Sequence, residues 1–134
     1  MALSELLPPL VAQGSGQVVI NTSASGKRPT PTAVLYSALR AGANMLVRNA
    51  ALNVGGAGVT VNATGTYAMD YPSFLHDVGA DEDPNVRKQV ENSLPMGKLV
   101  EPEEAAHFVA TLIDGKGTAQ TGQLFAIDAG WAEM

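Results

Sequence analysis

The chain has 134 residues, the size of one compact domain, and 46% of them are apolar, which is enough for a folded core. Its formal net charge of −5 argues against a nucleic-acid partner, and the absence of cysteine excludes disulfides and thiolate metal sites. No apolar run approaches the roughly 20 residues of a membrane span, and the N-terminal residues lack the basic start of a signal peptide. We therefore expect one cytoplasmic domain, residues 1–134, with no membrane partner.

The N-terminal segment predicts a helix followed by a strand. Residues 3–12 have the pattern of a short amphipathic helix, although Pro8 and Pro9 disturb it. After a glycine-containing loop, the apolar run at 17–22 predicts the first strand.

A long helix and a second strand come next. The helix is expected at about 32–53, and Asn53 with Gly55–Gly56 would end it as a left-handed C-cap does. The strand is expected at about 58–63. The glycine run at 55–58 is not read as a phosphate loop, because it follows a helix and opens a strand, the reverse of a phosphate cradle.

The second half of the chain predicts an irregular stretch at 68–84, two helices and a last strand. The helix at 84–92 has a favourable proline at its start, and another helix opens at Pro102 with an apolar stripe that ends before Gly115. The last strand is expected at about 123–128.

This order, β-α-β-α-α-β, predicts the fold class. Strands joined by helical crossovers form a parallel sheet with right-handed connections, and short apolar strands fit a sheet covered on both faces. We expect an α/β fold, a truncated Rossmann-like domain with a three-stranded parallel sheet and flanking helices.

Three side chains with chemical content come together in this scheme. Ser23 stands where the first strand ends, and reactive side chains in α/β sheets gather at such strand ends. Tyr36 and Arg40 are four residues apart on the next helix and share a face. A guanidinium near a phenol favours the phenolate, the form that accepts a proton. We expect these three residues to form a catalytic group.

The sequence resembles the second half of the short-chain dehydrogenase/reductase superfamily. The resemblance rests on five pieces in order: Ser23 after a strand, Tyr36 with a basic residue four later, VTVNATG at 59–65, PMGKLVEPEEAA at 95–106, and TGQLFAIDAGW at 121–131. It implies that the three strands correspond to family strands 5, 6 and 7, at one edge of a seven-stranded sheet.

The basic residue departs from the usual family pattern, because Arg40 stands where Tyr-x-x-x-Lys is common. A Ser-Tyr-Arg set resembles the halohydrin dehalogenases of this superfamily, which do not use a cofactor. The loop Thr66–Leu75 resembles the aromatic loop that those enzymes place around halide and substrate. The resemblance implies that Thr66, Tyr67 and Tyr71 bind substrate or halide, and that a vicinal halohydrin would become an epoxide plus halide.

The first half of the family fold, with its glycine-rich dinucleotide motif, has no counterpart in the sequence. The strand at 17–22 would then lack a neighbour, and an unpaired edge exposes backbone N–H and C=O groups. We expect a homo-oligomer that covers this edge, and an isolated chain with little activity.

Three functions remain open: a halohydrin dehalogenase-like enzyme with no cofactor, a fragment of a short-chain oxidoreductase that uses NAD or NADP, and a non-catalytic oligomeric remnant. Each of the first two takes a small-molecule substrate. Other candidates are weaker. His76 and His107 lack a ligand pattern, Trp131 is read as a core or interface residue, and the acidic run at 77–83 lacks the spacing of a calcium loop. No metal is expected.

Overall fold

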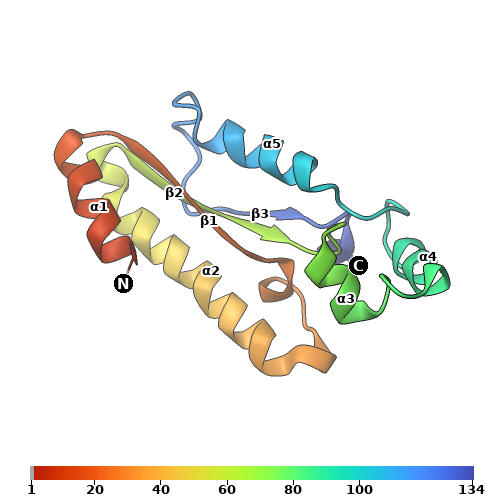
Figure 1. Ribbon diagram of the computed structural model, residues 1–134. Helices are drawn as coiled ribbons and strands as arrows, with labels where there is room; N and C mark the ends of the chain where they lie inside the picture. The colour runs from red at the N-terminus through yellow and green to blue at the C-terminus, as the bar shows by residue number, and fades with distance from the viewer. Residues whose placement is uncertain (1) are drawn as a thin grey trace.

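The computed structural model describes residues 2–134 as a three-stranded parallel sheet with helices on both faces (Figure 1). The strands are β1 (Gly16–Ser23), β2 (Val59–Thr66) and β3 (Leu124–Ile127), in the order β1-β2-β3. Helices α1 (Ala2–Gln13) and α2 (Val34–Val54) cover one face of the sheet, and α5 (Pro102–Leu112) covers the other. The predicted fold class is confirmed.

The register aligns the carboxyl ends of the three strands. Ser23 lies opposite Thr66, and Thr66 lies opposite Ile127. The central strand β2 is buried along nearly its whole length, as expected for a strand covered on both faces. Strand β1 has β2 as its only neighbour in the sheet formed by residues 2–134, so the predicted open edge is present.

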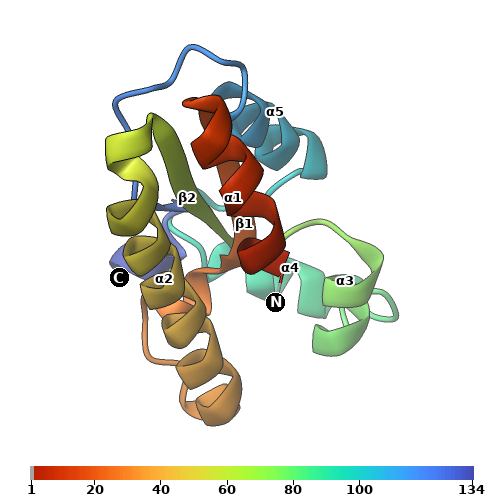
Figure 2. The ribbon, with the colours of Figure 1, turned by 90° about the vertical axis from the view of Figure 1, so that its left-hand side faces the viewer.

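The apolar side chains form two clusters. The first lies between the sheet and the pair α1 and α2, the two helices in front of and beside β1 and β2 in Figure 2, and Val47 of α2 and Val61 of β2 are fully buried in it. The second lies at the carboxyl ends of the strands and contains Leu99, Val100 and Trp131. The second cluster supports the region in which Ser23 lies.

The end of α2 differs from the prediction. Gly55 is right-handed, with φ −59°, and the helix continues as a 3-10 turn over Gly55–Ala57. The left-handed residue is Gly58, with φ 75°, and a Cβ there would lie 2.5 Å from the carbonyl oxygen of Gly14. The expected left-handed C-cap at Asn53 and Gly55–Gly56 was therefore wrong. Gly58 makes the turn because both its backbone conformation and its close contact require glycine.

The stretch 68–84 is not wholly irregular, which corrects a second expectation. It contains α3 (Pro72–Val78), which starts at a proline and ends at Gly79 in the left-handed conformation, with φ 74°. The next helix, α4 (Pro84–Asn92), has its predicted bounds, and the Asp83 carboxylate accepts from the Asn85 N–H at 2.8 Å.

Two classes of feature are absent from residues 2–134. None of the helices there combines the length and the apolar character needed to cross a bilayer. No group of three or more His, Cys, Asp or Glu side chains in the same range could hold a metal ion.

Candidate active site

Ser23 lies buried at the carboxyl end of β1, with 4% of its surface exposed. Its hydroxyl oxygen accepts a hydrogen bond from the Ser25 N–H at 3.1 Å. The same hydroxyl donates across the sheet to the carbonyl oxygen of Thr66 at 3.4 Å. Ser23 therefore caps the 3-10 turn Ala24–Gly26 and ties the end of β1 to the end of β2.

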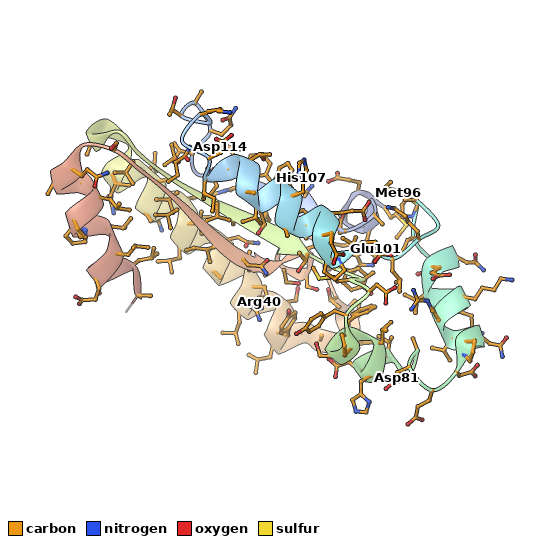
Figure 3. The ribbon with its side chains drawn as sticks, turned by 45° about the horizontal axis from the view of Figure 1, so that its top comes forward. Arg40, Asp81, Met96, Glu101, His107 and Asp114 are labelled. Atoms are coloured by element: carbon orange, nitrogen blue, oxygen red, sulfur yellow. The ribbon has the colours of Figure 1, made fainter. Side chains whose placement is uncertain are left out.

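Tyr36 and Arg40 lie on the first turns of α2, one turn apart, as predicted. The Arg40 guanidinium carbon lies 4.8 Å from the centre of the Tyr36 ring, over its face, so the two side chains make a cation–π contact. Arg40 is labelled near the middle of Figure 3, on α2. Tyr36 is 44% exposed. Among residues 2–134 no carboxylate forms an ion pair with Arg40. The contact that the structure gives for the Arg40 guanidinium is therefore the face of the Tyr36 ring.

The segment that follows Ser23 packs directly on α2. We call residues 23–30 the serine loop. A Cβ on Gly26 would lie 2.6 Å from the carbonyl carbon of Arg40, so only glycine allows this close approach. The Ser37 hydroxyl donates to the carbonyl oxygen of Ser25 at 2.5 Å. The structure thereby holds the serine loop against the helix turn that carries Tyr36 and Arg40.

Ser23 and Tyr36 share no hydrogen bond. The connection between them runs through their neighbours, since Ser25 bonds both the Ser23 hydroxyl and the Ser37 hydroxyl. An open cavity of about 430 Å³ beside the serine loop is lined by Arg28, Pro31 and Ser37, among others, and not by Ser23 or Tyr36. The assignment of Ser23, Tyr36 and Arg40 as a catalytic group stays a prediction.

The predicted substrate-binding residues lie in two places. Thr66 is next to Ser23, and Tyr67 follows it with its ring stacked on Trp131 at 4.0 Å between ring centres and edge-to-face with Phe74 at 5.8 Å. Burial raises the pKa of the Tyr67 phenol, and the positive charge of Arg28 opposes this effect. Tyr71 stands immediately before α3 and is 54% exposed. Thr66 and Tyr67 thus lie beside Ser23, whereas Tyr71 marks the start of the next segment.

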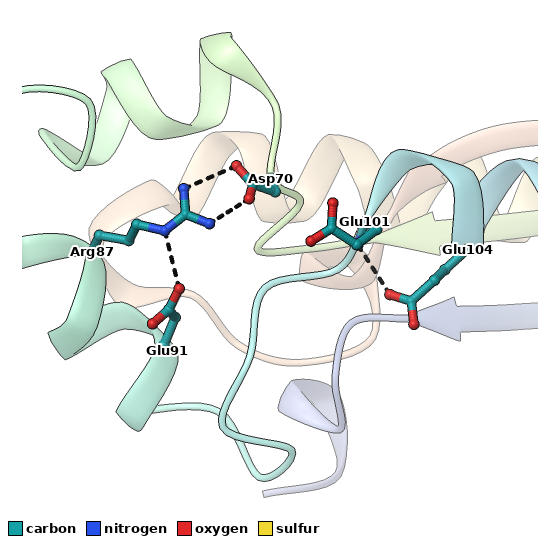
Figure 4. Close-up of polar contacts among 5 residues, drawn as sticks. All are labelled: Asp70, Arg87, Glu91, Glu101 and Glu104. Carbon is teal, nitrogen blue, oxygen red and sulfur yellow. Dashed lines mark hydrogen bonds and ion pairs between the residues drawn. The ribbon is translucent and has the colours of Figure 1, made fainter. Parts of the chain in front are cut away.

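That next segment, residues 71–98, leaves the sheet and returns to it. Its base is closed by a parallel bridge between Met69 and Val100. Arg87 on α4 donates from both terminal guanidinium nitrogens to the carboxylate of Asp70, and its Nε donates to Glu91 at 3.0 Å (Figure 4). We call residues 71–98 the excursion; the Arg87–Asp70 pair fastens α4 to its base.

Sequence reasoning missed a contact between the serine loop and residues 128–133, which we call the C-terminal turn. The Arg28 guanidinium lies 4.7 Å from the centre of the Trp131 ring, and its Nη1 donates to the Trp131 carbonyl oxygen at 2.7 Å. Lys27 pairs with Glu133. Lys27 and Arg28 are adjacent basic residues in the sequence, but no spacing in it connects them to residues about a hundred positions away.

The two histidines are exposed on helices, His76 on α3 and His107 on α5. The His76 Nδ1 lies 3.1 Å from an Asp81 carboxylate oxygen at the exposed end of α3. His107 is exposed on α5, well away from Arg40 in Figure 3.

A nicotinamide dinucleotide is the cofactor expected if the chain is an oxidoreductase. A pyrophosphate needs a glycine-rich turn between a strand and a helix. Within residues 2–134, β1 is followed by the serine loop, and α2 occupies the space beside its Gly26. The glycine run 55–58 leads from α2 into β2, and so from a helix into a strand. These residues do not fit the phosphates of a dinucleotide.

Comparison with known proteins gives the family. The model described as "Enoyl-(Acyl carrier protein) reductase" matches residues 1–132. The chain is 28% identical over 131 residues to the "Uncharacterized oxidoreductase YmfI" of Bacillus subtilis, covering 98% of this chain and 52% of the relative. It is 30% identical over 132 residues to "2,5-dichloro-2,5-cyclohexadiene-1,4-diol dehydrogenase LinX" of Sphingobium indicum, covering 98% and 51%. The chain thus spans about half the length of these relatives.

Solved structures agree with the sequence matches. Levodione reductase superposes with a TM-score of 0.88 at 27% identity, covering 98% of this chain and 52% of that one. The actinorhodin polyketide ketoreductase gives a TM-score of 0.86 at 25% identity, covering 93% and 50%. Together with the family match over nearly the whole sequence, these likenesses show that the chain belongs to the short-chain dehydrogenase/reductase superfamily.

Proposed function

We propose that this chain supplies the catalytic half of a short-chain oxidoreductase that acts on a hydroxyl or carbonyl group of a small organic molecule. The observation that carries the proposal is the packing of the serine loop on the turn of α2 that carries Tyr36 and Arg40. The names of two relatives support the reaction class: LinX, and the 4-formylbenzenesulfonate dehydrogenase of Comamonas testosteroni at 29% identity over 124 residues, 92% of this chain and 49% of that one.

The three side chains would divide the proton chemistry between them. Tyr36 would exchange a proton with the substrate oxygen, because its phenol is partly exposed and can reach a bound molecule. The Arg40 guanidinium lies over the face of the ring and places a positive charge beside the phenol that exchanges the proton. Ser23 would hold the substrate oxygen by its hydroxyl, exchanging its long bond to Thr66 for one to the substrate.

The dinucleotide half of such an enzyme has to come from polypeptide other than residues 2–134, because these residues offer no phosphate cradle. The open edge of β1 is the position at which the sheet can be extended. A second copy of the chain, as expected from the sequence, would cover the edge but would add no cradle. Catalysis by an oxidoreductase would therefore require a polypeptide other than a second copy of this chain to supply the dinucleotide-binding half.

A second candidate function is halohydrin dehalogenation, and Arg40 is the specific observation in its favour. In that reaction Tyr36 takes the proton of a hydroxyl that neighbours the halogen-bearing carbon. The resulting alkoxide oxygen attacks the neighbouring carbon, a C–O bond forms, and the carbon–halogen bond breaks with release of halide and an epoxide. This reaction needs no dinucleotide, so the lack of a cradle does not weigh against it.

One experiment separates the two candidates. Residues 1–134 are co-expressed with the first half of the Sphingobium relative, and nicotinamide-dependent oxidation of small secondary alcohols is measured. We expect turnover that falls by at least about 100-fold in Tyr36→Phe, the loss typical of a missing acid–base group. A complex that binds the dinucleotide but shows no Tyr36-dependent turnover contradicts the oxidoreductase proposal.

Arg40→Lys is the matched variant. An oxidoreductase should tolerate lysine, because an ammonium keeps the positive charge on this face of α2. A dehalogenase selected for the guanidinium should lose halide release from a vicinal halohydrin, measured with the chain alone. Halide release from the unaltered chain, abolished in Tyr36→Phe, would establish the second candidate in place of the first.

A further inference from the structure

Three segments far apart in the sequence meet beside Ser23: the serine loop, the end of β2 with the adjoining α3, and the C-terminal turn. The Trp131 ring is stacked on Tyr67 of the β2 end, with 22° between the ring planes, and Arg28 of the serine loop lies over the same indole. Phe74 of α3 meets the Tyr67 ring edge-on. Trp131 is 9% exposed, so the stack is largely shielded from water. The C-terminal turn therefore contacts both segments that flank the serine hydroxyl.

The C-terminal turn is itself held in shape. The Asp128 carboxylate accepts from the Gly130 N–H at 3.0 Å and from the Ala132 N–H at 2.8 Å. The Ala129 carbonyl oxygen accepts from the Met96 N–H at 3.2 Å, which joins the turn to the end of the excursion. A turn fixed at both sides can hold the indole in one place, as a positioning group requires.

The contacts of Trp131 converge on the hydrogen bonds of Ser23. Arg28 belongs to the loop whose Ser25 N–H donates to the Ser23 hydroxyl. Tyr67 adjoins Thr66, whose carbonyl accepts from the same hydroxyl. The Trp131 ring thus contacts both the loop whose N–H donates to the Ser23 hydroxyl and the residue next to the carbonyl that accepts from it.

We propose that Trp131 is a positioning residue for this site: through Arg28 and Tyr67 it fixes the serine loop and the end of β2, and so sets the direction of the Ser23 hydroxyl. The inference rests on the proposed function for its purpose, since the serine matters only if it binds substrate. Its test does not need turnover, so it can fail while the proposed function stands, and the reverse.

The test is amide hydrogen exchange on the chain as it exists. The Ser25 amide reports the Ser23 hydroxyl directly, because that hydroxyl is its acceptor, and the Tyr67 amide reports the β2 end through its bond to Ile127 at 3.3 Å. In Trp131→Leu we expect both amides to exchange roughly tenfold faster, because the variant loses an aromatic stack and a cation–π contact. Trp131→Phe keeps a flat ring and should restore most of the protection.

Phe125→Leu is the matched control. It breaks the edge-to-face pair of Phe108 and Phe125, whose centres are 5.3 Å apart between α5 and β3, away from the serine loop. We expect it to leave the Ser25 amide unchanged. Equal acceleration in Phe125→Leu and Trp131→Leu, or unchanged exchange in Trp131→Leu, overturns the proposal.

If Trp131→Leu does not fold, Arg28→Met answers the same question with the indole in place. It removes the cation–π contact and the bond to the Trp131 carbonyl, while Tyr67 keeps its stack. Faster exchange at Ser25 with little change at Tyr67 supports the proposal. Unchanged exchange at Ser25 overturns it.

Discussion

Arg87 reaches back from α4 to Asp70, seventeen residues earlier, and pairs with both oxygens of its carboxylate (Figure 4). Asp70 adjoins the Met69–Val100 bridge, and its own N–H donates to the Val100 carbonyl at 2.8 Å. The pair therefore joins the middle of the excursion to its base. The hydrogen bonds to Asp70 raise the pKa of Arg87 further, so the guanidinium stays charged at every working pH.

Replacing this arginine should loosen the excursion more than the domain. We expect Arg87→Gln to lower the free energy of unfolding by about 1 kcal/mol, because the pair is two-pronged but is 36% exposed on the arginine side and screened by solvent. Limited proteolysis within 71–98 should become faster. Lys88→Gln, on the same helix, is the control for charge alone and should change neither; an equal effect in both variants would refute the role of the pair.

Tyr67 should make stability fall in alkali. Its folded pKa is raised by burial above the ordinary 10.0, so the unfolded chain loses the phenol proton first as pH rises. Stability is therefore retained below about pH 10 and lost as the pH climbs through the folded pKa. We expect Tyr67→Phe, which keeps the ring on Trp131, to lose less stability between about pH 8 and about pH 11 than the unaltered chain.

Tyr71→Phe is the control for this alkaline effect, since Tyr71 is largely exposed. Trp131 is the only tryptophan of the chain, so its fluorescence follows denaturant unfolding at the stack itself. Identical alkaline losses in the unaltered chain and in Tyr67→Phe would contradict the prediction.

Glu104 should make the start of α5 sensitive to acid. The pKa of its carboxyl is lowered by the hydrogen bond from Lys98 and then by the Glu101 N–H, which donates to it at 3.0 Å (Figure 4). A carboxyl with a lowered folded pKa contributes stability above its ordinary pKa of 4.5 and loses it as the pH falls through the folded value. Helicity measured by circular dichroism should therefore fall below about pH 4 less steeply in Glu104→Gln.

Glu103→Gln is the neighbouring control. Glu103 also lies in the first turn of α5 and shares the favourable helix dipole. Its substitution removes the general charge effect but leaves the Glu101 and Lys98 bonds. A Glu103→Gln profile that matches Glu104→Gln would show that the dipole, and not the capping bond, accounts for the acid response.

The open edge of β1 predicts self-association in the absence of another partner. Light scattering after size-exclusion chromatography should give a multiple of the 13.9 kDa chain mass. The variant Leu39→Glu, on α2 where this leucine is 66% exposed, tests the alternative that copies meet through the helix. Association that survives Leu39→Glu supports the edge; a monomer at all concentrations of the unaltered chain contradicts the prediction.

The sequence predicted the elements best where local signals are strong. Pro84 marked the start of α4, and the crossover pattern led to the parallel sheet. Helix α3 was missed because its seven residues give no apolar periodicity, and its only signals are Pro72 and Gly79. At α2, a glycine-rich end looked like a C-cap, but the contact of Gly58 with Gly14 is tertiary and leaves no trace in local sequence.

The same division applies to the site. The contact between Tyr36 and Arg40 follows from helical spacing, and the structure has it. The bond from the Ser23 hydroxyl to Thr66 and the stack of Trp131 on Tyr67 join residues about 43 and 64 positions apart, so they depend on sheet register and on the return of the chain. Such contacts depend on the fold and cannot be predicted from residues that are close together in the sequence.

The place of β2 in the sheet has a consequence for synthesis. Its partners are β1, which precedes it, and β3, which is not made until Leu124–Ile127. The nascent chain must carry a strand that is buried on both faces in the folded sheet, without its second partner, until almost all of residues 2–134 have been translated, and long-range parallel pairing is slow. During that interval β2 is a target for chaperones and for pairing with the wrong chain.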